Sequence, residues 1–349
     1  MSNLETRPAE MVLSCPDEDG PGIEVVTSRV VPLGGPRAMP VRRTLPSRER
    51  SFVGAWCFAD HYGPDDVAAT GGMDVAPHPH TGLQTVSWLF TGEVEHRDSA
   101  GVHAMVRPGE LNLMSSGVGI CHSEVSTPQT TVLHGVQLWL VLPREARGGP
   151  RGFQHHAPAP VELPGGAGTA SVFIGELLGE TSPVGTATPL LGAEITLEPG
   201  GVVDLPVRPD FEHGVLLDTG TVEVDDVAID RAELAFRAPC GETLRIASTG
   251  EGPARVILLG GEPFREEIVM WWNFIGSDHE EVVAARDAWN AGGDPAGAYA
   301  GSERFGRVEG YVGERAWLPA PDLPHVRLRP RRNPNAVTDV VATYEGEER

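Results

Sequence analysis

The sequence contains no lysine, and its charge is strongly negative. All 27 basic residues are arginine, against 49 acidic residues, which gives a formal net charge of -22 at pH 7. A protein that binds DNA or RNA directly neutralises phosphates with a basic face, so this balance argues against a direct nucleic-acid partner. The basic cluster near the C-terminus is interpreted as a solvated face that offsets local carboxylates. Its members are Arg327, Arg329, Arg331 and Arg332.

Cysteine is scarce and shows no paired spacing. The four cysteines, Cys15, Cys57, Cys121 and Cys240, form no CxxC motif. This argues against a disulfide framework or a structural zinc module. No run of about 18 apolar residues occurs, and the polar N-terminus lacks the apolar core of an export signal. We therefore expect a cytoplasmic protein without a membrane segment.

Glycine and proline, in contrast, are abundant, and the chain is long. Its 349 residues exceed the usual span of one domain, so two domains with separate cores are expected. With 43 Gly, 31 Pro and 40% apolar residues, the composition favours short strands joined by tight turns. A weak internal repeat relates VSWLFTGEVEH around Gly92 to VLLDTGTVEVD around Gly220. These features predict an all-β fold.

The organisation along the chain follows from its turn-rich stretches. A Gly- and Pro-rich stretch that begins at Pro143 marks the connection between two β domains. The clearest helix is predicted from Asp278 to Trp289, because Asp278 and Glu281 form a capping-box pattern and Gly292 supplies a stop. The expected units are a flexible N-terminal lead-in (1–20), a first β domain (21–145), a linker (146–168), a second β domain (169–276), and a helix with a wrapping tail (277–349).

Two short motifs carry the chemistry of the first domain. In a strand, side chains two residues apart face the same way, so His78 and His80 of an HPH motif point to one side. His122 and Glu124 of an HSE motif repeat this geometry. Three histidines and one carboxylate suit one Fe(II), Mn, Ni, Co, Cu or Zn ion, with water completing an open coordination sphere. A shared metal site explains these pairs better than four separate structural residues do.

The segment from Ala76 to Glu124 resembles the signature of the pirin family. The motifs HPHxGxxTV, HxDSxG from His96, PGE from Pro108 and SSGxGIxHSE fall in order, and HGVQLWLVLP follows from His134. The segment GGEPFREEIVMWWNFIG and the predicted helix after it are similar to the C-terminal region of bacterial pirin-like proteins. The resemblance covers residues from about 25 to about 320.

This resemblance implies a bicupin, that is, two tandem cupin barrels of the double-stranded β-helix or jelly-roll type, with a short C-terminal helix. It implies one metal ion, usually iron, held in the N-terminal barrel by His78, His80, His122 and Glu124. The second barrel of a pirin usually carries no metal. This sequence agrees, because the strands of its second half contain only His213 and no HxH or HxE pair. We expect a structural role for His213.

Pirins are associated with quercetin 2,3-dioxygenase activity, so the resemblance implies a metal-dependent dioxygenase that opens a flavonol ring with O2. Glu124 is then the catalytic base that accepts the proton of the flavonol 3-hydroxyl. The alternative is a non-catalytic, metal- or redox-dependent regulator that binds a transcription factor or a metabolic enzyme. The acidic charge suits a basic protein partner. A third interpretation is a metal-loaded cupin that acts on another small metabolite.

Four further residues are expected around the ligands or the pocket. Gln84 stands where many pirins have glutamate; it is a weaker ligand and no base, but it can orient a bound water or substrate. His96 either supports a ligand or lines the pocket mouth, and Asp98 fixes the local turn. His61 either reaches the cavity rim or stabilises a turn. Cys121 is expected on the strand face opposite to His122, as a small buried apolar residue.

Overall fold

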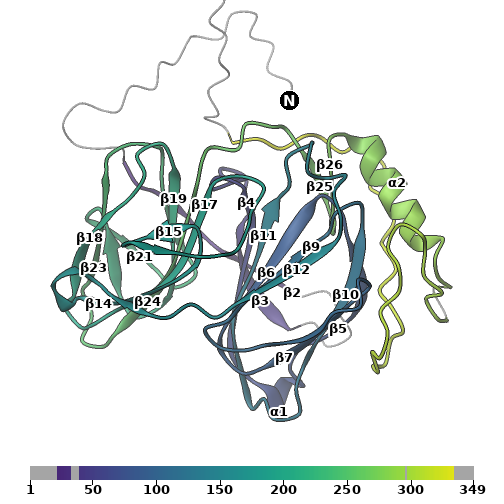
Figure 1. Ribbon diagram of the computed structural model, residues 1–349, viewed down its shortest axis with the longest axis horizontal. Coiled ribbons are helices and arrows are strands. Elements are labelled where there is room, and N and C mark those ends of the chain that lie inside the picture. The colour runs from purple at the N-terminus through teal and green to yellow at the C-terminus, as the bar shows by residue number, and fades with distance from the viewer. Residues whose placement is uncertain (1–21, 33–38, 295–296, 334–349) are drawn as a thin grey trace, which may run out of the picture.

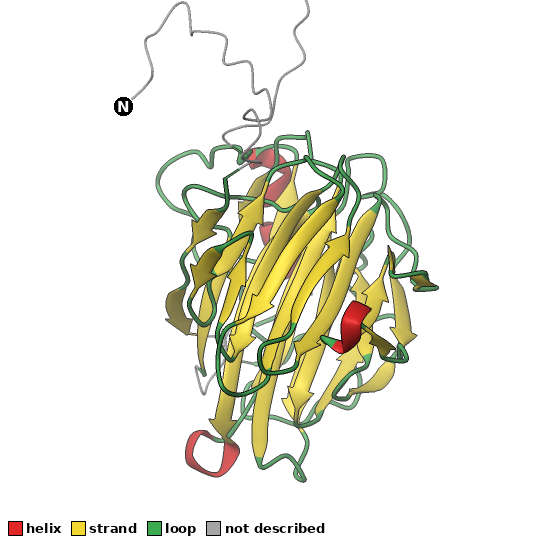
Figure 2. Ribbon diagram, turned by 90° about the vertical axis from the view of Figure 1, so that its left-hand side faces the viewer, coloured by secondary structure: helices red, strands yellow, loops and turns green. Residues whose placement is uncertain are grey.

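The computed structural model describes residues 22–32, 39–294 and 297–333, and strands dominate it (Figure 1 and Figure 2). The expected lead-in and the last part of the tail lie outside the described residues. Two β-barrels stand side by side, and each combines a seven-stranded sheet with a four-stranded sheet. Neighbouring strands in these sheets are antiparallel. The chain is an all-β bicupin with one short C-terminal helix, as predicted.

The first barrel contains the strands of the HPH and HSE motifs. Across its large sheet the order is β12 (Gly152–His156), β9 (Leu111–Ser115), β6 (Leu83–Thr91), β11 (Val132–Val141), β4 (Trp56–Asp66), β3 (Pro40–Leu45) and β2 (Arg29–Pro32). Across its small sheet the order is β5 (Asp74–His80), β10 (Ile120–Ser126), β7 (Val94–Asp98) and β8 (His103–Val106). The strand β5 is therefore an edge strand, which is where Pro79 costs no ladder hydrogen bond.

The second barrel repeats this plan. Across its large sheet the order is β1 (Glu24–Val26), β22 (Leu234–Arg237), β19 (Glu212–Thr219), β24 (Ala254–Gly261), β17 (Leu190–Leu197), β14 (Gly168–Ile174) and β13 (Val161–Glu162). Across its small sheet the order is β18 (Val202–Pro206), β23 (Thr243–Ser248), β20 (Val222–Val224) and β21 (Val227–Ile229). In the first barrel, the first two strands of the small sheet carry the metal motif. The two strands in the same place in the second barrel lack it.

Short hairpins and helices complete the described residues. The hairpins are β15 (Glu176–Leu177) with β16 (Glu180–Thr181) and β25 (Val269–Trp271) with β26 (Phe274–Gly276); the helical segments are α1 (Val67–Thr70), η1 (Pro164–Gly166) and α2 (His279–Asn290). The predicted helix is α2. Its cap forms as expected, because the Glu281 N–H donates to Asp278 Oδ1 at 2.9 Å. Within the described ranges, no helix combines the length and the apolar character that crossing a membrane requires.

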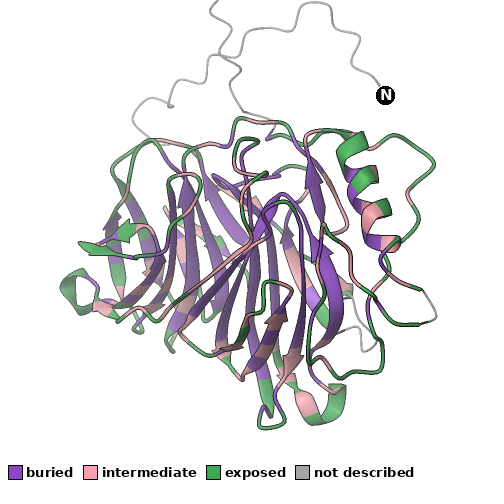
Figure 3. Cartoon of the chain, turned by 45° about the vertical axis from the view of Figure 1, so that its right-hand side comes forward, coloured by how far each residue is buried: buried purple, intermediate pink, exposed green. Residues whose placement is uncertain are grey.

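The two barrels pack through the outer faces of their large sheets. Trp56, Trp88 and Phe173 lie at the centre of this contact, with the Trp88 and Phe173 ring centroids 4.6 Å apart. The Trp88 indole N–H donates to Glu194 Oε2 across the contact at 2.6 Å. Burial runs through the strands of both barrels, whereas the outward face of α2 is exposed (Figure 3). The molecule therefore has a continuous core between the barrels.

The predicted domain boundaries remain predictions, but two strands pair outside the units in which they were expected. The strand β1, expected with the first barrel, pairs with β22 of the second. The strand β12, in the expected linker, pairs with β9 of the first barrel. Edge strands present unpaired N–H and C=O groups, and each exchanged strand covers one such edge. Local sequence patterns do not identify the edge that a short strand joins.

Candidate metal centre

The strands β5 and β10 bring the four predicted ligands together. His122 lies opposite His78 in the register of this pair, and a bulge follows between His122 and Glu124. All four side chains are buried, and all four line one cavity of about 250 Å³ inside the first barrel. The period-two spacing of the two motifs thus places both pairs on the inner face.

The ligand nitrogens of the three histidines converge. His80 Nε2 and His122 Nε2 are 3.0 Å apart, and the His78 and His122 ring centroids are 4.3 Å apart. One donor atom from each of His78, His80 and His122 falls within 4.8 Å of the others, and the same holds for His96, His122 and Glu124. Because the two groups share His122, this donor set suggests a single metal ion.

A hydrogen-bond chain fixes which nitrogens are available to a metal. The His78 Nδ1 group donates to Ala76 O at 2.9 Å, because a carbonyl only accepts, and this leaves Nε2 with its lone pair. His96 Nε2 lies 3.2 Å from Asp98 Oδ2, and His96 Nδ1 lies 3.3 Å from His122 Nδ1. If Asp98 accepts from His96, then His96 accepts from His122, and His122 Nε2 carries the lone pair. The residues therefore fit a divalent metal ion between the facing Nε2 atoms.

Burial keeps the histidines neutral. Desolvation lowers the pKa of His78 to about 4, and desolvation together with neighbouring histidines lowers the pKa of His80 and His122 well below their ordinary value. Neutral imidazole is the form that binds metal. Desolvation also raises the pKa of Glu124. Ser87 Oγ lies 3.4 Å from Glu124 Oε1 and donates to Gln137 Oε1 at 3.0 Å, so Glu124 has a polar neighbour on the barrel wall.

Sequence reasoning missed most of the pocket wall. Phe58 and Trp139 stack with centroids 4.0 Å apart and planes 10° apart, and the His80 ring lies 5.2 Å from Trp139. The alternation in VQLWLVL contained a signal for Gln137 and Trp139, which share one strand face. The remaining lining residues come from five places in the chain. They are Pro32, Arg43, Val75, Trp272, Asn273 and Leu318.

The residues that were predicted around the metal ligands lie in different places in the structure. His96 and Asp98 lie beside His122, and Asp98 Oδ1 also accepts from Ala100 N–H at 2.8 Å, which fixes the turn. Gln84 lies on the opposite face of β6 from Ser87 and bonds Ser115 Oγ at 3.1 Å, outside the pocket lining. Cys121 packs outside the barrel with the C-terminal aromatic residues, on the face opposite to His122, as expected.

The expected position of His61 at the cavity rim or in a turn was wrong. Its side chain points out of the first barrel, where His61 Nε2 and His134 Nε2 each lie 2.6 Å from Asp218 Oδ1 of the second barrel. Arg255 Nε donates to Asp218 Oδ2 at 2.7 Å. These are hydrogen-bond lengths, and the guanidinium already neutralises the carboxylate. We interpret the cluster as a polar link between the barrels. The sequence did not indicate it, because His61 and Asp218 are 157 residues apart.

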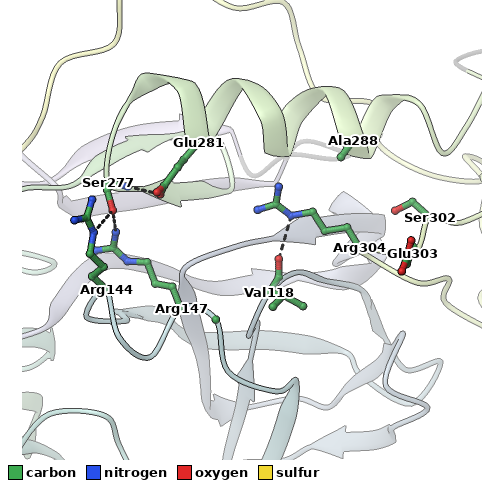
Figure 4. A pocket seen from close by; sticks show the side chains of 10 residues that line it. Val118, Arg144, Arg147, Ser277, Glu281, Ala288, Ser302, Glu303 and Arg304 are labelled. Carbon is green, nitrogen blue, oxygen red and sulfur yellow. Dashed lines mark hydrogen bonds between the residues drawn. The ribbon is translucent and has the colours of Figure 1, made fainter.

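A larger cavity, of about 860 Å³, lies under α2 (Figure 4). Arg144, Arg147 and Arg304 line it, and it contains none of the four predicted ligands. Both Arg144 Nε and Arg147 Nη1 donate to Ser277 Oγ, at 3.1 and 2.9 Å. Size alone therefore does not identify the candidate active site, and these arginines hold the start of α2 against the first barrel.

Two jelly-roll barrels with one histidine and carboxylate cluster inside the first define a bicupin with a candidate N-terminal metal centre. The family model Pirin matches residues 38–140, and the model Pirin C-terminal cupin domain matches residues 192–294. A Pseudomonas aeruginosa protein, provisionally named a quercetin 2,3-dioxygenase, is 39% identical over 325 residues, which cover 93% of this chain and 98% of that protein. The chain belongs to the pirin family.

Two further comparisons agree with this assignment. A Caulobacter vibrioides pirin-like protein is 37% identical over 262 residues, which cover 72% of this chain and 88% of that protein. The crystal structure of a quercetin 2,3-dioxygenase from Acinetobacter baumannii matches with a TM-score of 0.80 and 35% sequence identity. This match covers 88% of the present chain and 97% of that structure. The likeness therefore spans both barrels.

Proposed function

We propose that the protein is an iron-dependent dioxygenase of the quercetin 2,3-dioxygenase type, with His78, His80, His122 and Glu124 as the ligands of one Fe(II) ion. One observation carries the proposal: the four side chains open onto a cavity whose wall is the flat stack of Phe58 and Trp139. An aromatic wall beside a polar cluster suits a planar aromatic substrate. The names of the Pseudomonas and Acinetobacter relatives support the same reaction.

The chain's own residues perform the binding and proton steps. When bound, a redox-active divalent metal supplies a Lewis acid for the substrate oxygen and an electron path to O2. Glu124 accepts the proton of the flavonol 3-hydroxyl on a carboxylate oxygen, and Ser87, which donates to Gln137, lies beside that carboxylate. The buried aromatic wall excludes water from the reacting ring. The overall reaction consumes one flavonol and one O2 and gives an open ester and carbon monoxide.

The test is iron reconstitution without O2, removal of loose metal with a chelator, and then measurement of O2 uptake and carbon monoxide with quercetin. Loose redox metals oxidise flavonols by themselves, so carbon monoxide is the decisive product. Glu124→Gln is expected to retain part of the metal, because the three histidine ligands remain, and to lower turnover per bound metal ion by about a hundredfold or more. Glu95→Gln is the matched control, because Glu95 lies on the adjacent strand β7 but bonds Arg97 on the outside. Unchanged turnover in Glu124→Gln would exclude the base role.

The same assay separates the alternative functions. Tight metal binding without turnover of quercetin would favour a metal-dependent regulator with a protein partner, or another small substrate. Reconstitution with Mn, Ni, Co, Cu or Zn in parallel identifies the metal that supports turnover. The location proposed for this activity is the cytoplasm. Cys57 and Cys121 are buried free thiols, which suits a reducing compartment.

A further inference from the structure

The chain after the second barrel returns to the first barrel and covers the outside of its small sheet. We call residues 268–294 and 297–333 the cap. Its aromatic residues, including Phe274, Trp289 and Phe305, pack together with Cys121 on the outer face of β10. The helix α2 lies beside β10 and β5, on the side away from the second barrel (Figure 1). The cap therefore belongs to the first barrel in space, although it follows the second in sequence.

Main-chain hydrogen bonds attach the cap to the ligand strand on both sides of the HPH motif. Before the motif, the Leu318 N–H donates to Pro77 O at 2.9 Å. After it, the Ile275 N–H donates to Thr81 O at 3.0 Å, and the Thr81 N–H donates to Asn273 O at 3.4 Å. Because β5 is an edge strand, its outer groups are available for these bonds. The cap thus has a fixed position relative to His78 and His80.

Side chains add anchors on the same barrel. Arg144 and Arg147, which follow β11, both donate to Ser277 at the start of α2 (Figure 4). Arg304 of the cap donates from Nε to Val118 O at 3.1 Å, and Val118 lies just before β10. These anchors join the cap to the loop before β10 and to the loop after β11. They make the cap a fixed wall instead of a loose tail.

One loop of the cap enters the lining of the metal cavity. Trp272 and Asn273 form the two-residue loop of the β25–β26 hairpin, and both line the cavity. Trp272 has a φ of 51°, in the left-handed region that favours glycine. Backbone strain of this kind persists where the surrounding structure and the function require it. Here it places an indole at the cavity, with its ring centroid 5.4 Å from that of Phe274.

The chemistry of this loop suits a ring that carries hydroxyl groups. Phe58 and Trp139 form the aromatic wall on the barrel side, and Trp272 adds an aromatic side chain from the cap. The Asn273 carboxamide makes no hydrogen bond to any side chain or backbone group in the part of the chain that the structure describes. It offers both a donor and an acceptor at the edge of the cavity. A planar ligand with a further hydroxyl besides the one at the metal matches this arrangement.

We propose that the cap selects the substrate: the Asn273 carboxamide bonds a hydroxyl group on a flat aromatic ligand held at the metal centre, and the Trp272 indole contacts its ring. This rests on the proposed function, because the metal centre holds the ligand through another hydroxyl. Trp272 and Asn273 are specificity residues in this assignment, and neither takes part in proton transfer. They would distinguish ligands by the hydroxyls that a ligand carries in addition to its metal-binding group.

The test is equilibrium binding of two flavonols to the metal-loaded protein without O2. Quercetin carries hydroxyls on its outer rings, whereas 3-hydroxyflavone keeps only the metal-binding hydroxyl. Asn273→Ala is expected to weaken quercetin binding about fivefold to tenfold and to leave 3-hydroxyflavone binding within about twofold, since one neutral hydrogen bond is lost. Trp272→Ala is expected to weaken both ligands by about tenfold. Trp271→Ala is the matched control, because Trp271 is the half-buried neighbour outside the cavity lining.

Metal content and thermal unfolding are measured for every variant, so that a loss of metal or of fold is detected. If Trp272→Ala does not fold, Trp272→Phe keeps an aromatic ring and is expected to weaken both ligands by about threefold. Equal weakening of both flavonols by Asn273→Ala, or equal effects of the Trp271 and Trp272 changes, would overturn the inference. Quercetin binding without carbon monoxide release would refute the dioxygenase alone. No binding of either flavonol to the unaltered protein would refute both.

Discussion

The two barrels share one sheet plan but differ inside at the same strand pair. In the first barrel, β5 and β10 point His78, His80, His122 and Glu124 inward. In the second barrel, β18 and β23 stand in the same place in the small sheet. Their inward side chains are Val203, Leu205, Leu244 and Ile246, all buried in an apolar cluster. The barrel thus depends on backbone pairing and apolar burial, and the metal site depends on four replaceable side chains.

The polar residues of the second barrel do not rebuild a ligand set. His213 pairs in register with Arg237, and both side chains are buried. Neither ring nitrogen of His213 has a hydrogen-bond partner among the residues that the structure describes. The inter-barrel residue Asp218 instead bonds two histidines of the first barrel. The comparison therefore predicts that substitutions in the first barrel change metal binding. Substitutions in the second barrel should change stability and its pH dependence.

The largest expected effect is the loss of metal when a ligand is removed from the first barrel. His78→Ala should reduce the bound metal from one ion per chain to almost none, because loss of a direct ligand exceeds the roughly 10- to 100-fold effect of losing a supporting residue. Elemental analysis after desalting measures this. His213→Ala, in the second barrel, should keep the ion. Equal metal loss in both variants would contradict the comparison.

The second expected effect concerns stability, when a ligand-type residue enters the second barrel. Leu244→His should lower the free energy of unfolding by about 4 kcal/mol, since it loses apolar packing and buries an unpaired imidazole. Leu244 is fully buried opposite Leu205. Urea unfolding measures the change, and Leu244→Met, which conserves volume, should cost less than about 1.5 kcal/mol. A second bound metal ion in Leu244→His would show that one residue suffices to rebuild the site.

The third expected effect tests the link between the barrels. Asp218→Asn should lower the free energy of unfolding by about 3 kcal/mol, because it leaves Arg255 without its carboxylate partner at a largely buried contact. Asp204→Asn is the matched control in the same barrel. Asp204 forms an exposed pair with Arg245, and its loss should cost less than about 1 kcal/mol. Equal destabilisation by the two changes would show that the inter-barrel cluster adds nothing.

The smallest expected effect is a pH dependence from the second barrel. Desolvation, with the charge of Arg237, lowers the pKa of His213 from 6.5 to about 4 in the folded chain. The unfolded chain therefore binds a proton that the folded chain excludes, and stability falls as the pH drops from 6.5 toward 4. Between pH 7 and pH 5 this contribution is about 2 kcal/mol.

His213→Leu should remove that part of the acid sensitivity in urea unfolding at the two pH values. His325→Leu, at an exposed position, should keep the dependence of the unaltered chain. The same acid sensitivity in both variants would mean that other groups, and not His213, control the stability of the chain below neutral pH. The prediction does not involve the metal ligands, so it can be measured on the metal-loaded protein.

Much of the fold was predictable because its signals are local. Apolar strands, glycine turns and the Asp278 cap depend on residues close in sequence, so an all-β chain with one helix could be expected. The two HxH-type pairs predicted the candidate ligand cluster, since the period-two rule fixes the face of His78 and His80 within one strand. Gln84 and His61 were expected near the pocket and lie outside it, because strand parity alone does not say which face meets the cavity and which meets the other barrel.

The sequence by itself determined the class of fold, the absence of an HxH pair from the second barrel and the residues that can bind a metal, because each of these depends on residue type and short spacing. Only the tertiary structure decided that β1 joins the second barrel and β12 the first, that Asp218 joins His61 to His134, and that Trp272 and Asn273 complete the cavity. These contacts join segments far apart in the chain. Local sequence patterns do not identify such distant partners, because these contacts form only when the complete barrels pack together.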